Sequence, residues 1–175
     1  MERAAQLDSG VIAIDGRAAS GKSTMARQLS EILHAPVVQM DDFFVPPALR
    51  SEERFQVPGS NVHYERFAEE VLPDILSKNE FAYRIFDCSI MDYNGYKKIE
   101  TSRWRIVEGS YSQHPQFGEY ADIRVYSDVD PEEQMRRILV RNGEKMAEMF
   151  RTRWIPLEEE YFDAYGIRTK ADLIV

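Results

Sequence analysis

Cysteine is almost absent from this chain of 175 residues, in which Cys88 is the only one. A single thiol excludes an internal disulfide and any metal site that needs several cysteines. No apolar run approaches the ~18 residues that a membrane-spanning helix requires, and the segment Met1–Gln6 shows no signal-peptide pattern. These absences predict a cytoplasmic protein with no membrane-spanning segment.

Positive charge is also scarce relative to negative charge. The 22 Lys and Arg residues stand against 30 Asp and Glu residues, which gives a formal net charge of −8 at pH 7. Nucleic acids and anionic membranes are usually bound by a basic surface, so neither is an expected partner. The length fits a single domain over residues 1–175. The sequence does not separate an interface from the core, so it predicts no oligomeric state.

A glycine-rich segment near the start, Gly16–Ser23, matches the pattern G-x-x-x-x-G-K-S/T in full. It follows the apolar run Val11–Ile14 and opens a stretch of helical spacing. Backbone N–H groups of such a loop point at phosphate oxygens, and the start of the helix adds its positive dipole end. Lys22 supplies charge to the β- and γ-phosphates, and the Ser23 hydroxyl ligates Mg²⁺. The motif predicts ATP and Mg²⁺ as cofactors. The predicted nucleotide-binding residues here are Gly16, Ala18, Ala19, Ser20, Gly21, Lys22, Ser23 and Thr24.

Strands and helices alternate along the chain. The predicted strands are Val11–Ile14, Val37–Met40, Trp104–Glu108, Ile123–Ser127 and Ala171–Val175. The predicted helices run from Lys22 to about Leu33, from Tyr64 to Leu76, from Asp130-Pro131 onward, and from about Glu144 to Ala164 with a kink or a division at Pro156. This alternation predicts an α/β fold, a three-layer α/β/α sandwich around a five-stranded parallel sheet.

Two segments interrupt the alternation. Residues 41–61 contain three prolines and little periodicity, which predicts a long loop over the carboxyl edge of the sheet. The run Phe81–Phe86 is followed by the turn signal Asn94-Gly95, which predicts a small hairpin with a return strand near Tyr96–Glu100. We expect these segments to form a hairpin or lid insertion beside the site.

Carboxylates follow two of the predicted strands. Asp41 and Asp42 come after Val37–Met40, and Glu108 ends Trp104–Glu108. Ligands of open α/β sheets lie at this edge, where a carboxylate can accept a proton from an attacking hydroxyl or hold Mg²⁺. Ser23, Asp41 and Glu108 are the predicted metal ligands, and Asp41, Asp42, Lys22 and Glu108 are candidate catalytic residues. A helix cap, a solvated acid or a salt-bridged structural glutamate is the alternative. Phe43 and Phe44 either fill the core or form an apolar wall for an acceptor.

Three arginines, Arg136, Arg137 and Arg141, lie on the predicted helix after Asp130-Pro131. Arg137 and Arg141 are four residues apart and share one helix face. Arginines in a mobile lid can neutralise charge on a phosphoryl group during transfer. Arg137 is therefore a candidate catalytic residue, and Arg136 and Arg141 are candidates for nucleotide binding. A solvated face paired with nearby glutamates is the alternative.

Together these features resemble the uridine kinase and phosphoribulokinase branch of P-loop kinases, near the nicotinamide riboside kinases. Besides the glycine-rich loop, the resemblance rests on Gln39–Phe44, Ile106–Gly109, Asp128–Pro131 leading into Arg136-Arg137, and Trp154–Glu158. It covers nearly the whole chain and implies a P-loop NTPase fold. It also implies that Asp41 or Asp42 contacts and deprotonates a ribose hydroxyl, that Glu108 lies near the magnesium, and that the lid arginines contact the phosphates.

Two departures from the family concern the acceptor. The family has Asn-Phe-Asp-His, with the Asp on the ribose, where this chain has Asn61-Val62-His63-Tyr64. A family His that reads uracil is expected near Cys88, beyond Tyr83. The resemblance implies a kinase that phosphorylates a hydroxyl of a small molecule, most simply a nucleoside. Nicotinamide riboside or another small metabolite is the alternative acceptor. A P-loop NTPase or a nucleotide-binding regulator without kinase activity is the alternative function.

Overall fold

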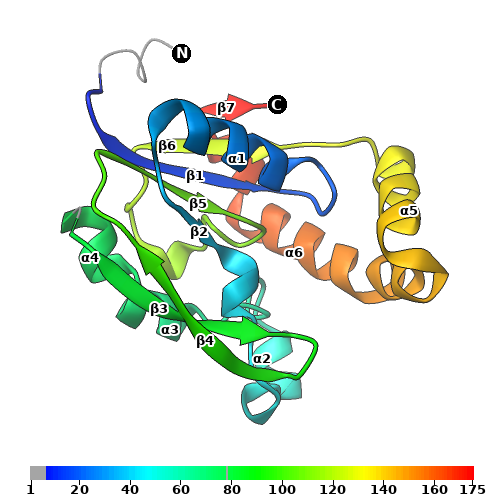
Figure 1. The fold of residues 1–175 in the computed structure, drawn as a ribbon. Coiled ribbons are helices and arrows are strands. Elements are labelled where there is room, and N and C mark those ends of the chain that lie inside the picture. The colour runs from blue at the N-terminus through cyan, green and yellow to red at the C-terminus, as the bar shows by residue number, and fades with distance from the viewer. Residues whose placement is uncertain (1–6, 78) are drawn as a thin grey trace.

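The computed structural model describes residues 7–77 and 79–175 (Figure 1), so the expectation about Met1–Gln6 lies outside the described residues. Its main sheet has five parallel strands in the order β2-β5-β1-β6-β7. These strands are β1 (Gly10–Gly16), β2 (Val37–Gln39), β5 (Trp104–Glu108), β6 (Ile123–Ser127) and β7 (Leu173–Ile174). The predicted five-stranded parallel sheet is confirmed, although the last strand pairs over only two residues.

The central strand β1 is buried on both faces, as its apolar sequence predicts. Ile12 and Ile14 pack in the cluster that includes residues of α1 (Lys22–Leu33). Val11 and Ala13 face the larger cluster, which includes residues of α3 (Tyr64–Glu70) and α6 (Ile155–Tyr165). Helices therefore cover both faces of the sheet (Figure 1), and the predicted three-layer sandwich is confirmed.

The helix predicted from Tyr64 to Leu76 is two helices, α3 and α4 (Leu72–Ser77). The backbone changes direction at Val71, where φ is −119°. Pro73 explains the break, because proline has no N–H for a helical hydrogen bond to the residue four positions earlier. Leu76, expected on the buried face, is 56% exposed.

The first helix after β6 begins as predicted. The start predicted near Glu144 follows a break within this helix, at Gly143, where φ is 77°. The Asp130 side chain accepts hydrogen bonds from the N–H groups of Glu132 and Glu133, which caps α5 (Pro131–Met149). A π-helical turn, η5 (Phe150–Trp154), joins α5 to α6, whose second residue is Pro156. The predicted division at Pro156 is confirmed, because proline cannot donate to the carbonyl of the preceding turn. The chain after α6 passes through α7 (Ile167–Lys170) before β7.

The hairpin is present, but its turn lies elsewhere than predicted. Strands β3 (Phe81–Asp87) and β4 (Asp92–Ile99) pair antiparallel in a separate sheet. Asn94-Gly95 lies inside β4, where the register shifts from Arg84 opposite Tyr96 to Phe86 opposite Tyr93. Gly95 has a φ of 82°, a conformation that serves a β-bulge as well as a hairpin turn. Residues 88–91 make the turn instead.

The long loop over residues 41–61 contains three short helices. These are η2 (Met40–Phe43), η3 (Pro47–Leu49) and α2 (Glu52–Phe55). A further short helix, η4 (Pro115–Phe117), lies outside this loop, after β5. Arg54 holds the loop by donating to the carbonyls of Ser60 (3.0 Å) and Val62 (3.1 Å) and to the Glu65 carboxylate (2.9 Å). The side chain of Arg54, which belongs to the loop, therefore fixes the loop's conformation. Among the helices of the described residues, none combines the length and the apolar character needed to span a bilayer.

Candidate active site

The glycine-rich loop joins β1 to α1 through a backbone that requires glycine at its start. Gly16 has a φ of 130°, and a Cβ there would lie 2.1 Å from the Ser127 carbonyl oxygen. Gly21, just before α1, has a φ of 107°. Lys22 is nearly buried, and its ammonium donates to the carbonyl oxygens of Gly16 (2.8 Å) and Arg17 (2.7 Å). The loop therefore wraps around its own lysine.

A cavity of about 470 Å³ lies against this loop, and we call it the phosphate-loop pocket. Its lining includes most of the predicted site: Ala18, Ala19, Gly21, Lys22, Ser23, Thr24, Asp41, Glu108, Arg137 and Arg141. Phe44, Gly109, Ser110, Phe150 and Glu158 complete the lining. Four predicted residues do not line it: Gly16, Ser20, Asp42 and Arg136. Of these, Gly16 still contributes through its carbonyl contact with Lys22.

Asp41 and Asp42 both lie in η2, but their surroundings differ. Asp41 lines the phosphate-loop pocket. The Asp42 carboxylate accepts a hydrogen bond from the Tyr83 hydroxyl at 2.8 Å, and its carbonyl accepts from the buried Arg66. Asp41 therefore faces the pocket, whereas Asp42 ties η2 to β3 and α3.

Glu108, at the end of β5, is buried and accepts a hydrogen bond from the Ser23 hydroxyl at 3.0 Å. Burial raises the pKa of Glu108; the negative charge of Asp41 adds to the rise, and Lys22 opposes it. The surrounding protein also raises the pKa of Asp41 by reducing its hydration, with Lys22 again opposing and Asp42 adding. Raised carboxylate pKa values in a cavity are typical of groups that exchange protons.

The three lid arginines do not share one environment. Arg137 donates to the Ala19 carbonyl of the loop at 3.1 Å, and it lines the phosphate-loop pocket together with Arg141. Arg136 donates to both carboxylate oxygens of Glu133, at 2.6 and 2.7 Å, and lies outside this pocket. Arg137 also donates to Glu133, at 2.7 Å. The glutamate-paired alternative therefore applies to both Arg136 and Arg137, but only Arg137 and Arg141 line the pocket.

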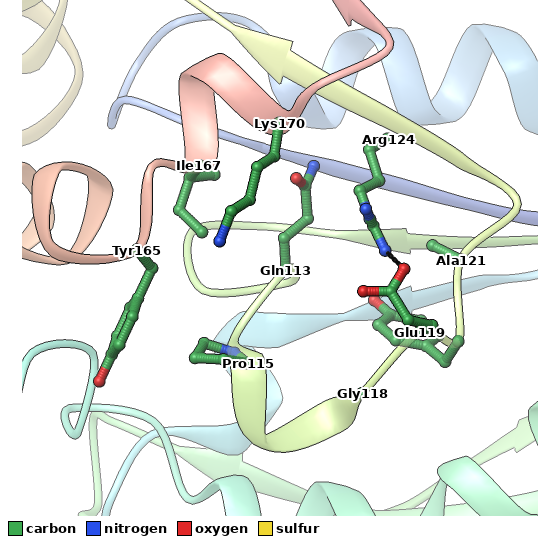
Figure 2. A pocket seen from close by; sticks show the side chains of 10 residues that line it. Gln113, Pro115, Gly118, Glu119, Ala121, Arg124, Tyr165, Ile167 and Lys170 are labelled. Carbon is green, nitrogen blue, oxygen red and sulfur yellow. Dashed lines mark hydrogen bonds and ion pairs between the residues drawn. The ribbon is translucent and has the colours of Figure 1, made fainter.

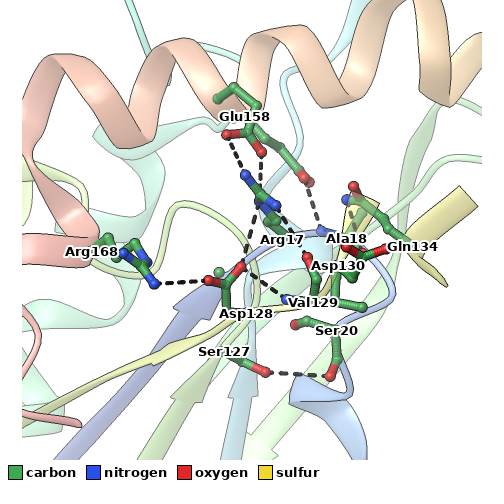
Figure 3. Close-up of polar contacts among 12 residues, drawn as sticks. Arg17, Ala18, Ser20, Ser127, Asp128, Val129, Asp130, Gln134, Glu158 and Arg168 are labelled. Carbon is green, nitrogen blue, oxygen red and sulfur yellow. Dashed lines mark hydrogen bonds and ion pairs between the residues drawn. The ribbon is translucent and has the colours of Figure 1, made fainter. Parts of the chain in front are cut away.

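The loop is anchored by charged groups that the sequence did not indicate (Figure 3). Arg17 donates to the Val129 carbonyl at 3.1 Å and pairs with Glu159 of α6 at 2.8 Å. Asp128 lies 3.7 Å from Arg17 and pairs with Arg168 at 3.3 Å. Because the motif allows any residue at position 17, its pattern carries no signal for these contacts.

Asp15, the residue before Gly16, is buried at the end of β1. Its carboxylate accepts from the N–H groups of Gly16 (2.7 Å), Tyr111 (3.1 Å) and Gln113 (2.9 Å), and from the Tyr161 hydroxyl (2.8 Å). Burial raises the pKa of Asp15, and these donors oppose the rise. One carboxylate thus joins β1, the segment after β5, and α6 beneath the site.

Glu158 of α6 is a second carboxylate that sequence reasoning missed. It is 7% exposed, and its Oε2 accepts from the Ala18 N–H at 2.9 Å while its Oε1 accepts from the Ser110 hydroxyl at 2.8 Å. Burial raises the pKa of Glu158, and Lys22 and these two donors oppose the rise. The resemblance ended at this residue without giving it a role, and helical spacing alone does not show that α6 packs on the loop.

A second cavity, of about 410 Å³, adjoins the first and shares Phe44, Phe150 and Glu158 with it. We call it the ring-lined pocket. Its lining is Phe44, Arg50, Asn61, Cys88, Met91, Tyr111, Met146, Met149, Phe150, Trp154 and Glu158. It is therefore walled mainly by aromatic rings and thioethers, with a few polar groups. A volume of this size suits a small molecule.

The residues expected to read an acceptor contribute little to this pocket. Tyr83 is fully buried and bonded to Asp42. Cys88 does line the pocket. Of the two phenylalanines, Phe43 is fully buried in the core, and Phe44 forms the wall between the cavities. Of the two predicted alternatives, filling the core therefore describes Phe43, and forming an apolar pocket wall describes Phe44.

A smaller cavity of about 120 Å³ lies away from this chemistry (Figure 2). Gln113, Arg124 and Tyr165 are among its lining residues, and Arg124 pairs with Glu119 beside it. It contains no residue of the glycine-rich loop and no predicted site residue. It is therefore not part of the candidate active site.

Comparison with known proteins agrees with the geometry. No protein-family model matches the chain. A cytidylate kinase from Pyrobaculum arsenaticum is 26% identical over 168 residues, which are 91% of this chain and 77% of that protein. A structure described as a possible uridine kinase from Bacillus stearothermophilus has a TM-score of 0.70 at 21% identity, covering 94% of this chain and 86% of the other.

A second solved structure, a candidate fructose transport system kinase from Silicibacter sp. TM1040, also has a TM-score of 0.70 at 21% identity. The match covers 97% of this chain and 91% of the other. These likenesses confirm the fold that the motifs implied. The chain thus shares its fold with the P-loop kinases of the uridine kinase branch.

Proposed function

We propose that this chain is an ATP-dependent kinase that transfers the γ-phosphate to a hydroxyl of a small molecule, in the first place a nucleoside. One observation carries the proposal. The phosphate-loop pocket brings Lys22, Ser23, Asp41 and Glu108 together, and a second cavity for a small molecule opens from the same wall. Kinases need two adjoining sites of this kind because they hold both reactants in line.

The phosphate end of ATP would be held by the loop amides and by Lys22. In this proposal Arg137 and Arg141 add positive charge from the lid side of the pocket. Preorganised positive groups of this kind stabilise a phosphoryl group during transfer. The helix α1, which begins at Lys22, adds its dipole to the same site.

The oxygens of Ser23, Asp41 and Glu108 fit Mg²⁺. Within residues 7–77 and 79–175 no three His, Cys, Asp or Glu side chains gather into a group that could hold a metal ion. Magnesium commonly binds one or two carboxylates together with phosphate oxygens and water, and the Ser23–Glu108 contact of 3.0 Å offers such a partial set. The bound ion would neutralise charge on the phosphates.

Asp41 is our candidate for the base that orients and deprotonates the acceptor hydroxyl. It lines the phosphate-loop pocket, where its carboxylate would be in reach of a hydroxyl beside the phosphates. Asp42 is engaged by the Tyr83 hydroxyl and is therefore the weaker candidate. Nicotinamide riboside or another small metabolite is the alternative acceptor. An excess of negative charge, −8 overall, supports action on a small molecule rather than on nucleic acid or a membrane.

A Mg²⁺-dependent assay of ADP formation with and without added nucleosides tests the function. We expect acceptor-dependent turnover and a phosphorylated product. Lys22→Ala should lower turnover by at least ~10²-fold, since it removes a preorganised charge from the transferred group. Circular dichroism should show the fold retained.

Lys145→Ala, which changes an exposed lysine of α5, is the matched control and should leave turnover unchanged. Normal turnover by Lys22→Ala would refute the assignment of the phosphate site. Equal ADP formation with and without every acceptor would instead support an NTPase. Binding of ATP with no turnover at all would support a nucleotide-binding regulator.

A further inference from the structure

Glu158 occupies the wall that separates the two cavities, and it lines both of them. The Ala18 N–H and the Ser110 hydroxyl each donate to a different oxygen of its carboxylate. An ionised carboxylate offers about four acceptor positions, so each oxygen retains capacity for another hydrogen bond. Both existing contacts come from donors, which oppose the rise that burial causes in the pKa of Glu158.

The other polar groups of the ring-lined pocket are few. Tyr111 and Asn61 form a side-chain hydrogen bond with each other. Tyr111 is also fixed in the backbone, with a φ of 76° and its N–H bonded to Asp15. Arg50 uses its Nε to donate to the Val45 carbonyl at 2.9 Å. Arg50 and Glu158 are therefore the two charged residues in this lining, and only Glu158 also borders the phosphate-loop pocket.

We propose that Glu158 selects the acceptor by accepting a hydrogen bond from a hydroxyl other than the one that is phosphorylated. The acceptor is then a neutral molecule with at least two hydroxyls and an apolar ring. Acceptors that already carry a phosphate at the position to be phosphorylated are rejected. This inference rests on the proposed kinase function and narrows it to nucleoside-like acceptors over nucleoside monophosphates.

The physical argument has two parts. A site built to bond a hydroxyl discriminates strongly against an analogue that lacks it, because the buried acceptor is left unpaired. A fixed carboxylate also repels a phosphate, and the single guanidinium of Arg50 in the ring-lined pocket offsets only part of the two negative charges of a monophosphate. The ring walls supply contact area for the apolar part of the acceptor.

Glu158→Gln separates acceptor selection from support of the loop. The glutamine carbonyl oxygen can still accept from the Ala18 N–H, and its amide can donate to the Ser110 oxygen. The negative charge is lost, and one acceptor oxygen becomes a donor. Glu160→Gln is the matched control, since Glu160 lies two residues further along α6 and is exposed.

The experiment measures phosphorylation of uridine, 2′-deoxyuridine, 3′-deoxyuridine and UMP with ATP and Mg²⁺, and the parallel set for cytidine. For the wild type we expect kcat/KM to fall at least ~10-fold for one deoxy analogue and at least ~10²-fold for the monophosphate. Glu158→Gln should reduce both ratios at least ~10-fold and leave the Kd of a nonhydrolysable ATP analogue within about twofold. Glu160→Gln should change neither.

Three results would overturn the proposal. A wild type that prefers the monophosphate would refute acceptor selection and the hydroxyl acceptor, and would leave ATP-dependent phosphoryl transfer standing. A Glu158→Gln protein that loses affinity for the ATP analogue, with unchanged acceptor ratios, would show that Glu158 only supports the loop. A wild type that binds the ATP analogue and phosphorylates no compound of either set would remove the nucleoside assignment and the inference with it. The wild-type ratios need no variant, so they decide the matter even if Glu158→Gln does not fold.

Discussion

The phosphate-loop pocket and the ring-lined pocket share a wall but are built in different ways. The first draws mainly on one contiguous motif, on Asp41 just after β2 and on Glu108 at the end of β5, all at the same edge of the sheet. The second collects side chains from the long loop, the hairpin turn, the segment after β5, and the junction of α5 with α6. The proposed ATP site is thus built on the central sheet and its first helix, whereas the proposed acceptor site is assembled from loops and the hairpin.

The two pockets also differ in how firmly they are held. Beneath the phosphate-loop pocket, buried Asp15 receives four hydrogen bonds and Arg17 is pinned by α6. The ring-lined pocket is bordered instead by Met91, Met146 and Met149, and methionine side chains adapt to the shape that they enclose. This difference suits a fixed phosphate site beside an acceptor site that can adjust to its ligand.

In this comparison of the two pockets, the largest loss of kcat is expected for a substitution of Asp41 in the phosphate-loop pocket. Asp41→Asn should lower kcat by ~10²–10⁴-fold, the usual contribution of a general base. Asp42→Asn is the matched control, because asparagine can still accept from the Tyr83 hydroxyl and Asp42 does not line the pocket. Its kcat should stay within about threefold. Steady-state kinetics on both variants checks the prediction, and a larger loss for Asp42→Asn would reverse the assignment.

A second effect separates the two sides of α5. Arg137→Ala should lower kcat by ~10²-fold, as loss of a preorganised donor usually does, since Arg137 bonds to the loop and lines the phosphate-loop pocket. Arg136→Ala removes a neighbouring, exposed arginine that pairs with Glu133, as Arg137 also does, but that does not line the pocket. Surface pairs of that kind contribute little, so both kcat and stability should be nearly unchanged. Equal losses for the two variants would contradict the distinction.

The sequence predicted the phosphate side of the fold well because its signals are local. The apolar strand before Gly16, the glycine pattern, and the acid at the end of β5 each carry their meaning within a few residues. The distinction between Asp41 and Asp42 needed the structure, because both begin the same loop. Asp41 lines the pocket, whereas Asp42 is bonded to Tyr83 and Arg66.

The acceptor side was harder to predict because its residues meet only through tertiary packing. Asn94-Gly95 was taken for a turn, although the same positive φ serves a bulge inside β4. Glu158 lies about fifty residues from Glu108 in the sequence, and nothing in its helical spacing shows that α6 brings it to Ala18. Most residues that line the phosphate-loop pocket could therefore be named from the sequence, with Glu158 as an exception, whereas most residues of the ring-lined pocket could not. The roles of these residues stay predictions.

The smallest effect tests whether the ring-lined pocket is used at all. Trp154 is a half-buried ring of this lining, and the neighbouring Arg153 lies over Phe55 of the long loop at 5.4 Å, so η5 and α2 are in contact here. Trp154→Ala removes apolar contact area worth about 1.4 kcal/mol, which raises the acceptor KM ~10-fold. The affinity for an ATP analogue should not change, because Trp154 does not line the phosphate-loop pocket.

Tyr96→Ala, which removes a ring that is 73% exposed on β4, is the control. An unchanged acceptor KM for Trp154→Ala would mean that the acceptor binds elsewhere. The ring-lined pocket would then not be the acceptor site, and its contrast with the phosphate-loop pocket would say nothing about acceptor binding.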